Sequence, residues 1–232
     1  MPALTTLGTI AWNCDFNWAA AEDYFRQALE AGPGHAEAHL AFSDFCCYQR
    51  RYDAAIDAAC RALEIDPNSA WINALLAQAL HMAGLHHEAI TQARNALEIA
   101  PGFPFAHLFA GAAALMLHRH EEGILHLEQA CAHSSRVDFV AGAGCAYGLA
   151  GKPDQARRIL HQLQHGEAPV PAIALAMLHL GLGDHGRALD MLEQAYAQRD
   201  WHVLLLHAEP LFRPLRRHPR AIALLERLQL PD

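Results

Sequence analysis

The sequence has no apolar run long enough to cross a bilayer, because Gly, His or a charged residue interrupts each apolar stretch first. It also lacks a secretion signal at its start. The opening MPALTTLGTIAWNCDF carries no basic residues ahead of an apolar stretch and no convincing cleavage site. We therefore expect a cytoplasmic protein that does not bind membranes.

Clustered basic charge is equally scarce. The formal net charge is −8 at pH 7, and basic residues gather only in the short stretch RPLRRHPR at 213–220. A surface that binds duplex nucleic acid needs many Lys and Arg side chains close together. We expect no direct binding of nucleic acid, and we interpret the late arginines as solvated helix ends.

Motifs that carry chemistry are missing as well. The six cysteines form no C-x-x-C pair, which is typical of reduced thiols that serve as small core residues. The glycines of GAGCAYG (142–148) miss the dinucleotide-binding spacing, and no strand precedes them. The sequence also shows no nucleophile elbow and no paired carboxylates. It therefore predicts a non-catalytic protein that needs no cofactor.

What the sequence does contain is a near-repeat with a period of 34 residues. Its copies read NWAAAEDYFRQALEAGP (17–33), RYDAAIDAACRALEIDP (51–67) and LHHEAITQARNALEIAP (85–101). Each copy has apolar residues at helical spacing and ends on a proline, which cannot continue a helix. Each copy therefore predicts an amphipathic helix with a fixed end.

A second apolar stretch precedes each later copy, so the helices are expected to pair as hairpins. Small residues lie where the two helices of a hairpin would cross, for example Ser43 opposite Ala55 and Gly111 opposite Gly123. A larger side chain there would push the helices apart. The period continues with slippage to the C-terminal part, and no strand-like alternation interrupts it. The predicted hairpins span about 3–33, 36–67, 70–101, 104–135, 137–166 and 169–198.

The spacing, the small crossing residues, the aromatic three positions before the small alanine (Trp18, Tyr52) and the closing proline resemble tetratricopeptide repeats. This resemblance implies an all-α, right-handed solenoid over residues 1–199. His86 replaces the aromatic in the third copy, which departs from the family pattern.

The remaining residues, 200–232, are similar to the closing segment of bacterial tetratricopeptide regions. They carry an aromatic-led start at Trp201, a turn through Pro210 and Phe212, and a last apolar run over 221–230. A solenoid needs such a cap, because its last apolar face has no further repeat to cover it. In that family the region often follows a winged-helix regulator, a cyclase or a kinase. The resemblance implies a regulatory part of a bacterial signalling or transcription system, and leaves open whether the chain is one domain of a longer protein.

In the proteins that this chain resembles, the first helix of each hairpin lines a concave groove. The inward positions carry no Lys or Arg, so the terminal-carboxylate clamp of some family members is not expected here. We predict instead that the groove binds an apolar or helical segment of a protein or peptide, and a second copy of the chain is among the partners such a surface could take. The alternative is that some of these side chains pack between repeats or beneath the chain's own tail. The predicted groove residues are Tyr48, Trp71, Gln78, His81, Met82, Phe105, Phe109 and Met116.

Seventeen histidines suggest a second class of function, a sensor that binds a metal or a small ligand. The best pair is His161 and His165, which share one face of a predicted helix. No spacing secures a third ligand, and HEAIT (87–91) lacks the second His of the H-E-x-x-H motif. We therefore predict no metal site and keep the sensor as the alternative function.

Overall fold

A computed structural model describes residues 2–230 of the chain. Residue 1 and residues 231–232, the outer ends of the two predicted units, lie outside the described residues. The described part contains helices and no strand. The α-helices are α1 (Pro2–Asn13), α2 (Trp18–Ala31), α3 (Ala36–Tyr48), α4 (Tyr52–Ile65), α5 (Ala70–Met82), α6 (His86–Ile99), α7 (Pro104–Met116), α8 (His120–His133), α9 (Val137–Leu149), α10 (Pro153–Gln164), α11 (Ala172–Gly181), α12 (His185–Ala197), α13 (Leu205–Ala208) and α14 (Pro219–Arg227). Two 3-10 helices, η1 (Trp201–Leu204) and η2 (Pro210–Leu215), flank α13.

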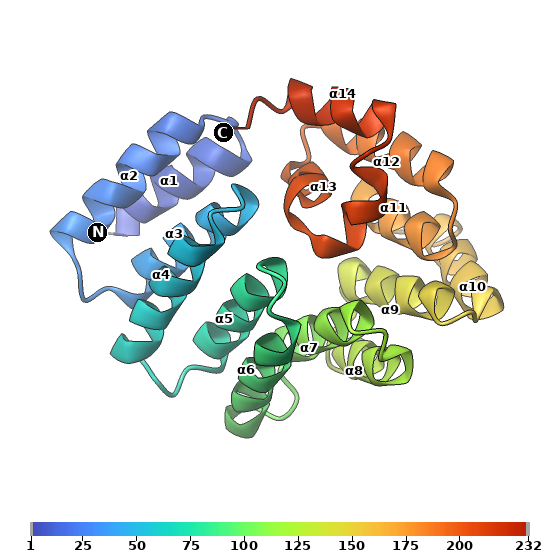
Figure 1. The fold of residues 1–232 in the computed structure, drawn as a ribbon, viewed down its shortest axis with the longest axis horizontal. Coiled ribbons are helices and arrows are strands. Elements are labelled where there is room, and N and C mark those ends of the chain that lie inside the picture. The colour runs from blue at the N-terminus through green and yellow to red at the C-terminus, as the bar shows by residue number, and fades with distance from the viewer. Residues whose placement is uncertain (1, 231–232) are drawn as a thin grey trace.

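Helices α1 to α12 form successive antiparallel pairs that curl into a ring (Figure 1). The odd-numbered helix of each pair lies on the inside of the ring, and the even-numbered helix lies outside (Figure 1). This arrangement confirms the prediction of an all-α solenoid of helical hairpins. No helix within residues 2–230 has both the length and the apolar character that a membrane span requires.

The paired helices approach closely at the small residues. The Ser43 hydroxyl on α3 donates a hydrogen bond of 2.7 Å to the carbonyl oxygen of Ala55 on α4. A Cβ atom added to Gly111 on α7 would lie 2.8 Å from the Leu127 side chain and 3.1 Å from the carbonyl oxygen of Gly123 on α8. The crossings therefore leave no room for a larger side chain, as the sequence pattern indicates.

The turn inside each of the six hairpins uses one residue with a positive φ angle, two positions before the second helix. Gly84, Gly151 and Gly183 have φ angles of 87°, 72° and 75°. Phe16, Arg50 and His118 occupy the equivalent positions with φ angles of 51°, 60° and 58°, although a side chain disfavours this left-handed conformation. The hairpin geometry therefore imposes on these three residues a backbone conformation that they do not favour by themselves.

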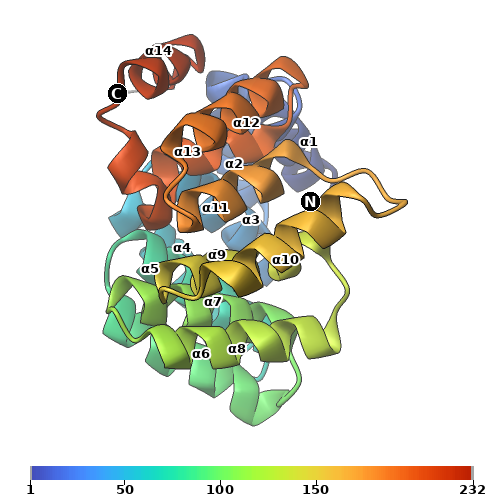
Figure 2. The ribbon, with the colours of Figure 1, turned by 90° about the vertical axis from the view of Figure 1, so that its right-hand side faces the viewer.

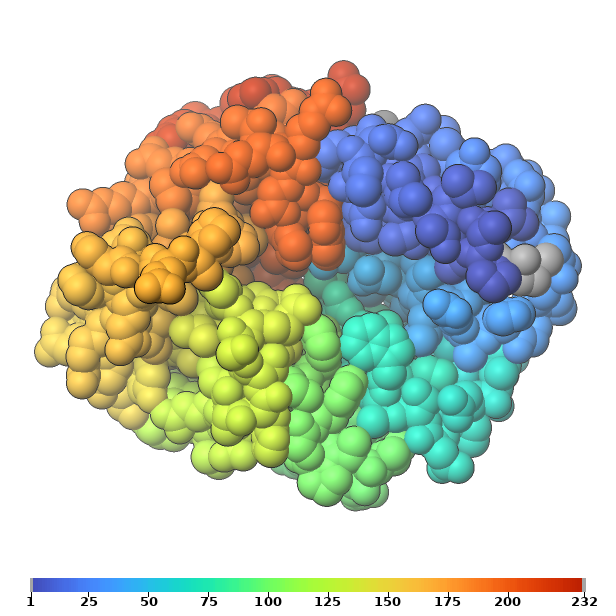
Figure 3. All heavy atoms as spheres, turned by 180° about the vertical axis from the view of Figure 1, so that it is seen from behind, coloured from blue at the N-terminus to red at the C-terminus, as the bar shows by residue number. Residues whose placement is uncertain are grey.

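The chain does not stop at the last hairpin but turns back into the ring. Trp201 of η1 packs with its ring centroid 5.4 Å from that of Trp12 on α1 and 5.4 Å from that of Tyr48 on α3. The Tyr52 hydroxyl donates a 3.2 Å hydrogen bond to the carbonyl oxygen of Ala208 on α13. One apolar cluster therefore joins the first hairpins to the last helices. In Figure 3 the N-terminal hairpin and the C-terminal helices meet and close the ring.

We propose to treat residues 1–199 as the solenoid and residues 200–232 as its cap. The regular pairing ends at Asp200, whose carboxylate accepts a 3.0 Å hydrogen bond from the backbone N–H of His202 and starts η1. Figure 2 shows α12, α13 and α14 stacked at one end of the molecule, away from α6 and α8. The cap thus covers the last hairpin and also contacts the first hairpins.

We predict that the substitution His118→Gly raises the free energy of unfolding by about 0.5–1 kcal/mol. Glycine removes the cost of the left-handed conformation, about 1 kcal/mol or more, and gives part of that gain back through a freer unfolded chain. Urea unfolding followed by circular dichroism measures the change. Gln129→Gly is the matched control, because Gln129 is an exposed residue inside α8, where glycine is expected to destabilise. A His118→Gly variant less stable than the native chain would contradict this account of the turn.

Candidate functional site

The ring encloses a cavity of about 610 Å³. Figure 3 shows the hollow at the centre of the molecule, with atoms of the cap at its base. Side chains from α3, α5, α7, α9 and α11 form most of its wall, and the cap forms another part. Leu127 of α8 and the connections before α9 and α11 complete it. The lining includes Asp44, Tyr48, Trp71, Gln78, Met82, Phe105, Phe109, Met116, Arg136, Asp138, His202 and Glu209.

The period of 34 residues arranges the cavity wall in rows. One row, near the start of the inner helices, is aromatic: Trp71 on α5 and Phe105 on α7 meet edge to face with ring centroids 5.1 Å apart. Phe139 on α9 packs behind this row, with its centroid 5.3 Å from that of Phe105, but it is fully buried and does not line the cavity. A second row, two helical turns further on, is formed by Asp44, Gln78 and Ala112, each separated by the same period.

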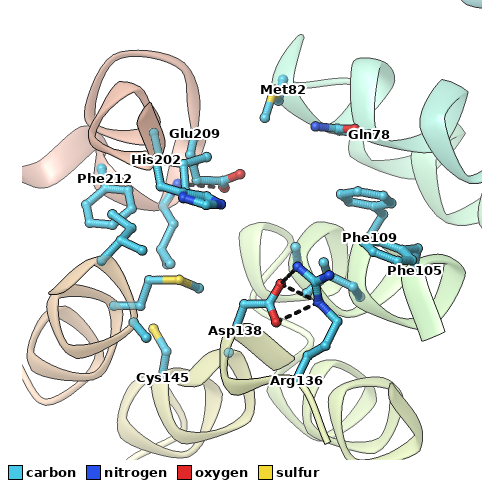
Figure 4. Close-up of a pocket in the computed structure, with 18 of the residues that line it drawn as sticks. Gln78, Met82, Phe105, Phe109, Arg136, Asp138, Cys145, His202, Glu209 and Phe212 are labelled. Carbon is cyan, nitrogen blue, oxygen red and sulfur yellow. Dashed lines mark hydrogen bonds and ion pairs between the residues drawn. The ribbon is translucent and has the colours of Figure 1, made fainter. Parts of the chain in front are cut away.

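The aromatic row offers an apolar surface that is only partly covered. Trp71 keeps 43% of its surface exposed although it packs against Phe105. Phe109 lies one turn beyond Phe105, and Figure 4 shows both rings at the same side of the cavity as Gln78. Exposed aromatic surface inside a concave site is typical of binding surfaces rather than of cores.

Seven of the eight predicted groove residues line this cavity, and His81 does not. His81 is 1% exposed, and its Nε2 atom lies 2.8 Å from a carboxylate oxygen of Glu209 on the cap. Tyr48 and Met82 line the cavity but are each only 4% exposed. Tyr48 also stacks on Trp12 with centroids 5.1 Å apart. These three residues therefore pack beneath the chain's own tail. Those left for a partner are Trp71, Gln78, Phe105, Phe109 and Met116.

Charged groups enter the cavity from three directions. Arg136 and Asp138, at the start of α9, form an ion pair with Nη2 2.8 Å from Oδ2, and Figure 4 shows this pair between the aromatic wall and the cap. The guanidinium of Arg136 also lies over the ring of Phe105, 5.4 Å from its centroid. Glu209 approaches from the cap, and its pKa lies below the usual range because His81 and the N–H of Leu211 outweigh the opposing effect of its burial.

Asp44 differs from these groups, because no basic side chain forms a hydrogen bond or ion pair with it in the described part of the chain. The Gln78 side chain donates a 3.3 Å hydrogen bond to one of its oxygens. Burial raises the pKa of Asp44 to about 6, and the bond from Gln78 and the charge of His202 oppose this rise only in part. The cavity therefore holds a carboxylate whose ionised form the fold disfavours.

Arg136, Asp138 and the cap residues line the cavity although the sequence pattern did not predict them. Phe139, which packs behind the aromatic row, follows Phe105 by 34 residues, so the period itself could have placed it there. Arg136 precedes α9 and Asp138 lies in its first turn, just after the connection where the period slips. The cap residues enter the cavity only because the chain folds back across the ring, and no local pattern encodes that contact.

Two sequence segments, 17–70 and 48–104, match the tetratricopeptide repeat family model. The structure continues the same hairpins to α12. Residues 17–104 therefore match the tetratricopeptide repeat family, and the later hairpins share the same architecture. Among curated proteins, none matches the chain.

Several solved structures share the fold. PilW, a type IV pilus biogenesis factor, is 18% identical over 97% of both chains with a TM-score of 0.65. A tetratricopeptide repeat protein of Parabacteroides merdae is 15% identical over 84% of this chain and 77% of its own, with a TM-score of 0.67. In a complex of Cut9 with Hcn1, the similar chain is 18% identical over 97% of this chain and 42% of its own, with a TM-score of 0.63. At these identities the likeness shows the fold alone.

The histidines do not converge on a metal site within residues 2–230, where no group of three or more His, Cys, Asp or Glu side chains could hold an ion. The rings of His161 and His165 stack with centroids 4.1 Å apart, and His165 Nδ1 hydrogen-bonds the carbonyl oxygen of His161. His107 and His126 form a separate pair with their Nδ1 atoms 3.0 Å apart. No feature of the described residues favours the alternative of a metal sensor.

Replacing Asp44 by Asn is predicted to stabilise the protein at neutral and higher pH. The folded-state pKa of about 6 lies above the unfolded value near 3.8, so stability from this group is present at low pH and is lost as the pH rises through about 6. Asp44→Asn should raise the free energy of unfolding by about 2 kcal/mol near pH 8, and the gain should vanish near pH 4. Urea unfolding at both pH values measures it. A gain that does not depend on pH would show that the charge is not its cause.

For His207 on α13, at the contact between the cap and the first hairpins, we predict the opposite pH dependence of the free energy of unfolding. Its burial, together with the charges of Arg50 and Arg216, lowers its pKa to about 4. The fold therefore loses stability as the pH falls from about 6.5 toward 4, by about 2 kcal/mol from this one group. Between about pH 7 and pH 4.5, the free energy of unfolding should fall by about 2 kcal/mol less in the variant His207→Gln than in the native chain. His165→Gln, at an exposed histidine, should behave like the native chain, and equal acid sensitivity in all three proteins would refute the assignment.

Proposed function

We propose that this protein is a non-catalytic interaction module that takes an apolar segment of a partner protein into the cavity of its ring. The observation that carries the proposal is Trp71, a large aromatic side chain that is 43% exposed at the cavity wall. Aromatic residues in partly enclosed sites supply much of the affinity of protein interfaces. The fold supports the same class of function, because tetratricopeptide repeats are scaffolds for protein interaction.

The cavity limits the size of what enters. One turn of an α-helix about 11 Å wide and 5.4 Å long fills roughly 500 Å³. The cavity holds about 610 Å³, so it accommodates about one turn or a few extended residues while the cap stays in place. The bound segment is therefore short, and the rest of the partner lies outside the ring.

The wider context of the proposal comes from resemblance. The tail of this chain is similar to the closing segment of tetratricopeptide regions in bacterial regulators, and we propose a regulatory role in signalling or transcription on that ground. The similar structure of Cut9 was solved as part of a hetero-tetramer with Hcn1, which is an instance of the fold in a protein complex. PilW is described as a pilus biogenesis factor.

The proposal predicts that short peptides selected from a random displayed library by the full chain are enriched in apolar residues. Alanine at Trp71 and at Phe105 together should weaken the binding of a selected peptide by about tenfold or more, since an aromatic anchor contributes about 2 kcal/mol. Fluorescence anisotropy of the labelled peptide measures the affinity.

Leu125→Ala is the matched control for this experiment. Leu125 on α8 is 57% exposed and does not line the cavity, so its loss removes an exposed apolar side chain of similar kind. Circular dichroism should show both variants folded. Equal binding by the native chain, the double variant and the control would contradict the proposed site.

A further inference from the structure

The balance of charge in the cavity indicates what the bound segment carries. The ionisable side chains that line it are Asp44, Arg136, Asp138, His202 and Glu209. Arg136 and Asp138 neutralise each other, with Nε 3.0 Å from Oδ1 and Nη2 2.8 Å from Oδ2. Glu209 has His81 at 2.8 Å. Asp44 is the group left without a basic partner among the described residues.

The cation of Arg136 is held by one carboxylate and two aromatic rings. Its Nε and Nη2 atoms both point to Asp138, and its planar face lies over Phe105 and Phe139, 5.4 Å and 5.6 Å from the two centroids. Two of its N–H groups bond Asp138, and together the two side chains carry no net charge. Asp44 and Glu209 are the other carboxylates of the lining, so the cavity presents an acidic surface to a ligand.

His202 is the other basic side chain that lines the cavity, and it bonds a different carboxylate. Its Nδ1 atom lies 2.6 Å from a carboxylate oxygen of Asp200, and its ring stacks on Trp201 with centroids 3.9 Å apart. Asp44 therefore has one hydrogen bond, from Gln78, although a carboxylate can accept several.

The position of Asp44 relative to the aromatic row indicates how the apolar and basic groups of the ligand are spaced. Asp44 and Gln78 lie in the row two helical turns beyond the row of Trp71 and Phe105. Seven helical residues separate the two rows along an inner helix, which is a rise of about 10 Å. A segment that reaches both rows therefore has an apolar end and a hydrogen-bond donor about 10 Å away.

We propose that the cavity selects an apolar segment of a partner protein that carries one basic side chain, with the cation paired to Asp44 and the apolar residues against Trp71 and Phe105. This inference rests on the proposed function and adds the charge of the partner to it. Keeping a carboxylate charged away from water and without a basic partner costs free energy. A cationic partner offsets that cost and an uncharged one does not, so the cavity favours basic segments.

The test reads the charge of the peptides selected from the same displayed library by the native chain and by Asp44→Asn, both at about pH 8. The native chain should enrich peptides with one Lys or Arg among apolar residues over peptides with Asp or Glu at the same place. For a selected lysine peptide and its norleucine analogue, calorimetry should give affinities that differ by about tenfold, the effect of one charge-assisted hydrogen bond. Asp44→Asn should bind both analogues equally, and Leu125→Ala should keep the native preference.

The outcomes separate this inference from the proposed function. Apolar enrichment without basic residues, or equal binding of the two analogues by the native chain, overturns the inference and leaves the proposed function standing. Enrichment of acidic residues would also overturn it, because Arg136 would then be the recognising group. A preference for lysine that persists in Asp44→Asn assigns it to another carboxylate and refutes the role of Asp44. A library with no apolar enrichment contradicts both proposals.

Discussion

The packing of Trp201 against Trp12 and Tyr48 is the contact on which the shape of the molecule depends. The indole lies 5.4 Å from each of the two rings, and it joins a segment near residue 200 to the first two hairpins. Aromatic contacts of this kind bury large apolar areas, and they add a preference for edge-to-face geometry. An open solenoid would present a long groove. With this contact made, the same inner helices enclose a cavity.

Closing the ring changes the electrostatics of the inner surface as much as its shape. Glu209 and His81, nearly 130 residues apart in sequence, meet because the cap enters the ring, with their interacting atoms 2.8 Å apart. The cap also supplies part of the cavity lining through His202, Leu205 and Phe212. Asp44, which would be a solvated side chain on the wall of an open groove, instead has its pKa raised to about 6 by burial. Apolar packing at the cap therefore creates the charged feature that distinguishes this cavity.

The sequence alone predicted the inner wall well and the cap poorly, for a physical reason. A period of 34 residues places Trp71 above Phe105 and Asp44 beside Gln78 once each hairpin covers its neighbour, because all contacts in a solenoid are between adjacent repeats. The same logic would have placed Phe139 behind the aromatic row. Contacts across the ring follow no period. The Tyr52 hydroxyl, for example, donates a hydrogen bond to the carbonyl oxygen of Ala208, which no sequence pattern predicts. The sequence pattern places Tyr48, His81 and Met82 in an open groove, but the chain's own tail covers all three.

The cap contact and the cavity are linked by their opposite responses to pH. Burial disfavours the charged form of both Asp44 and His207, so the first prefers low pH in the folded protein and the second prefers high pH. Between about pH 4 and 6 the cap contact weakens while the carboxylate in the cavity loses its charge. Both shifts have one structural cause, the burial that follows from closing the ring.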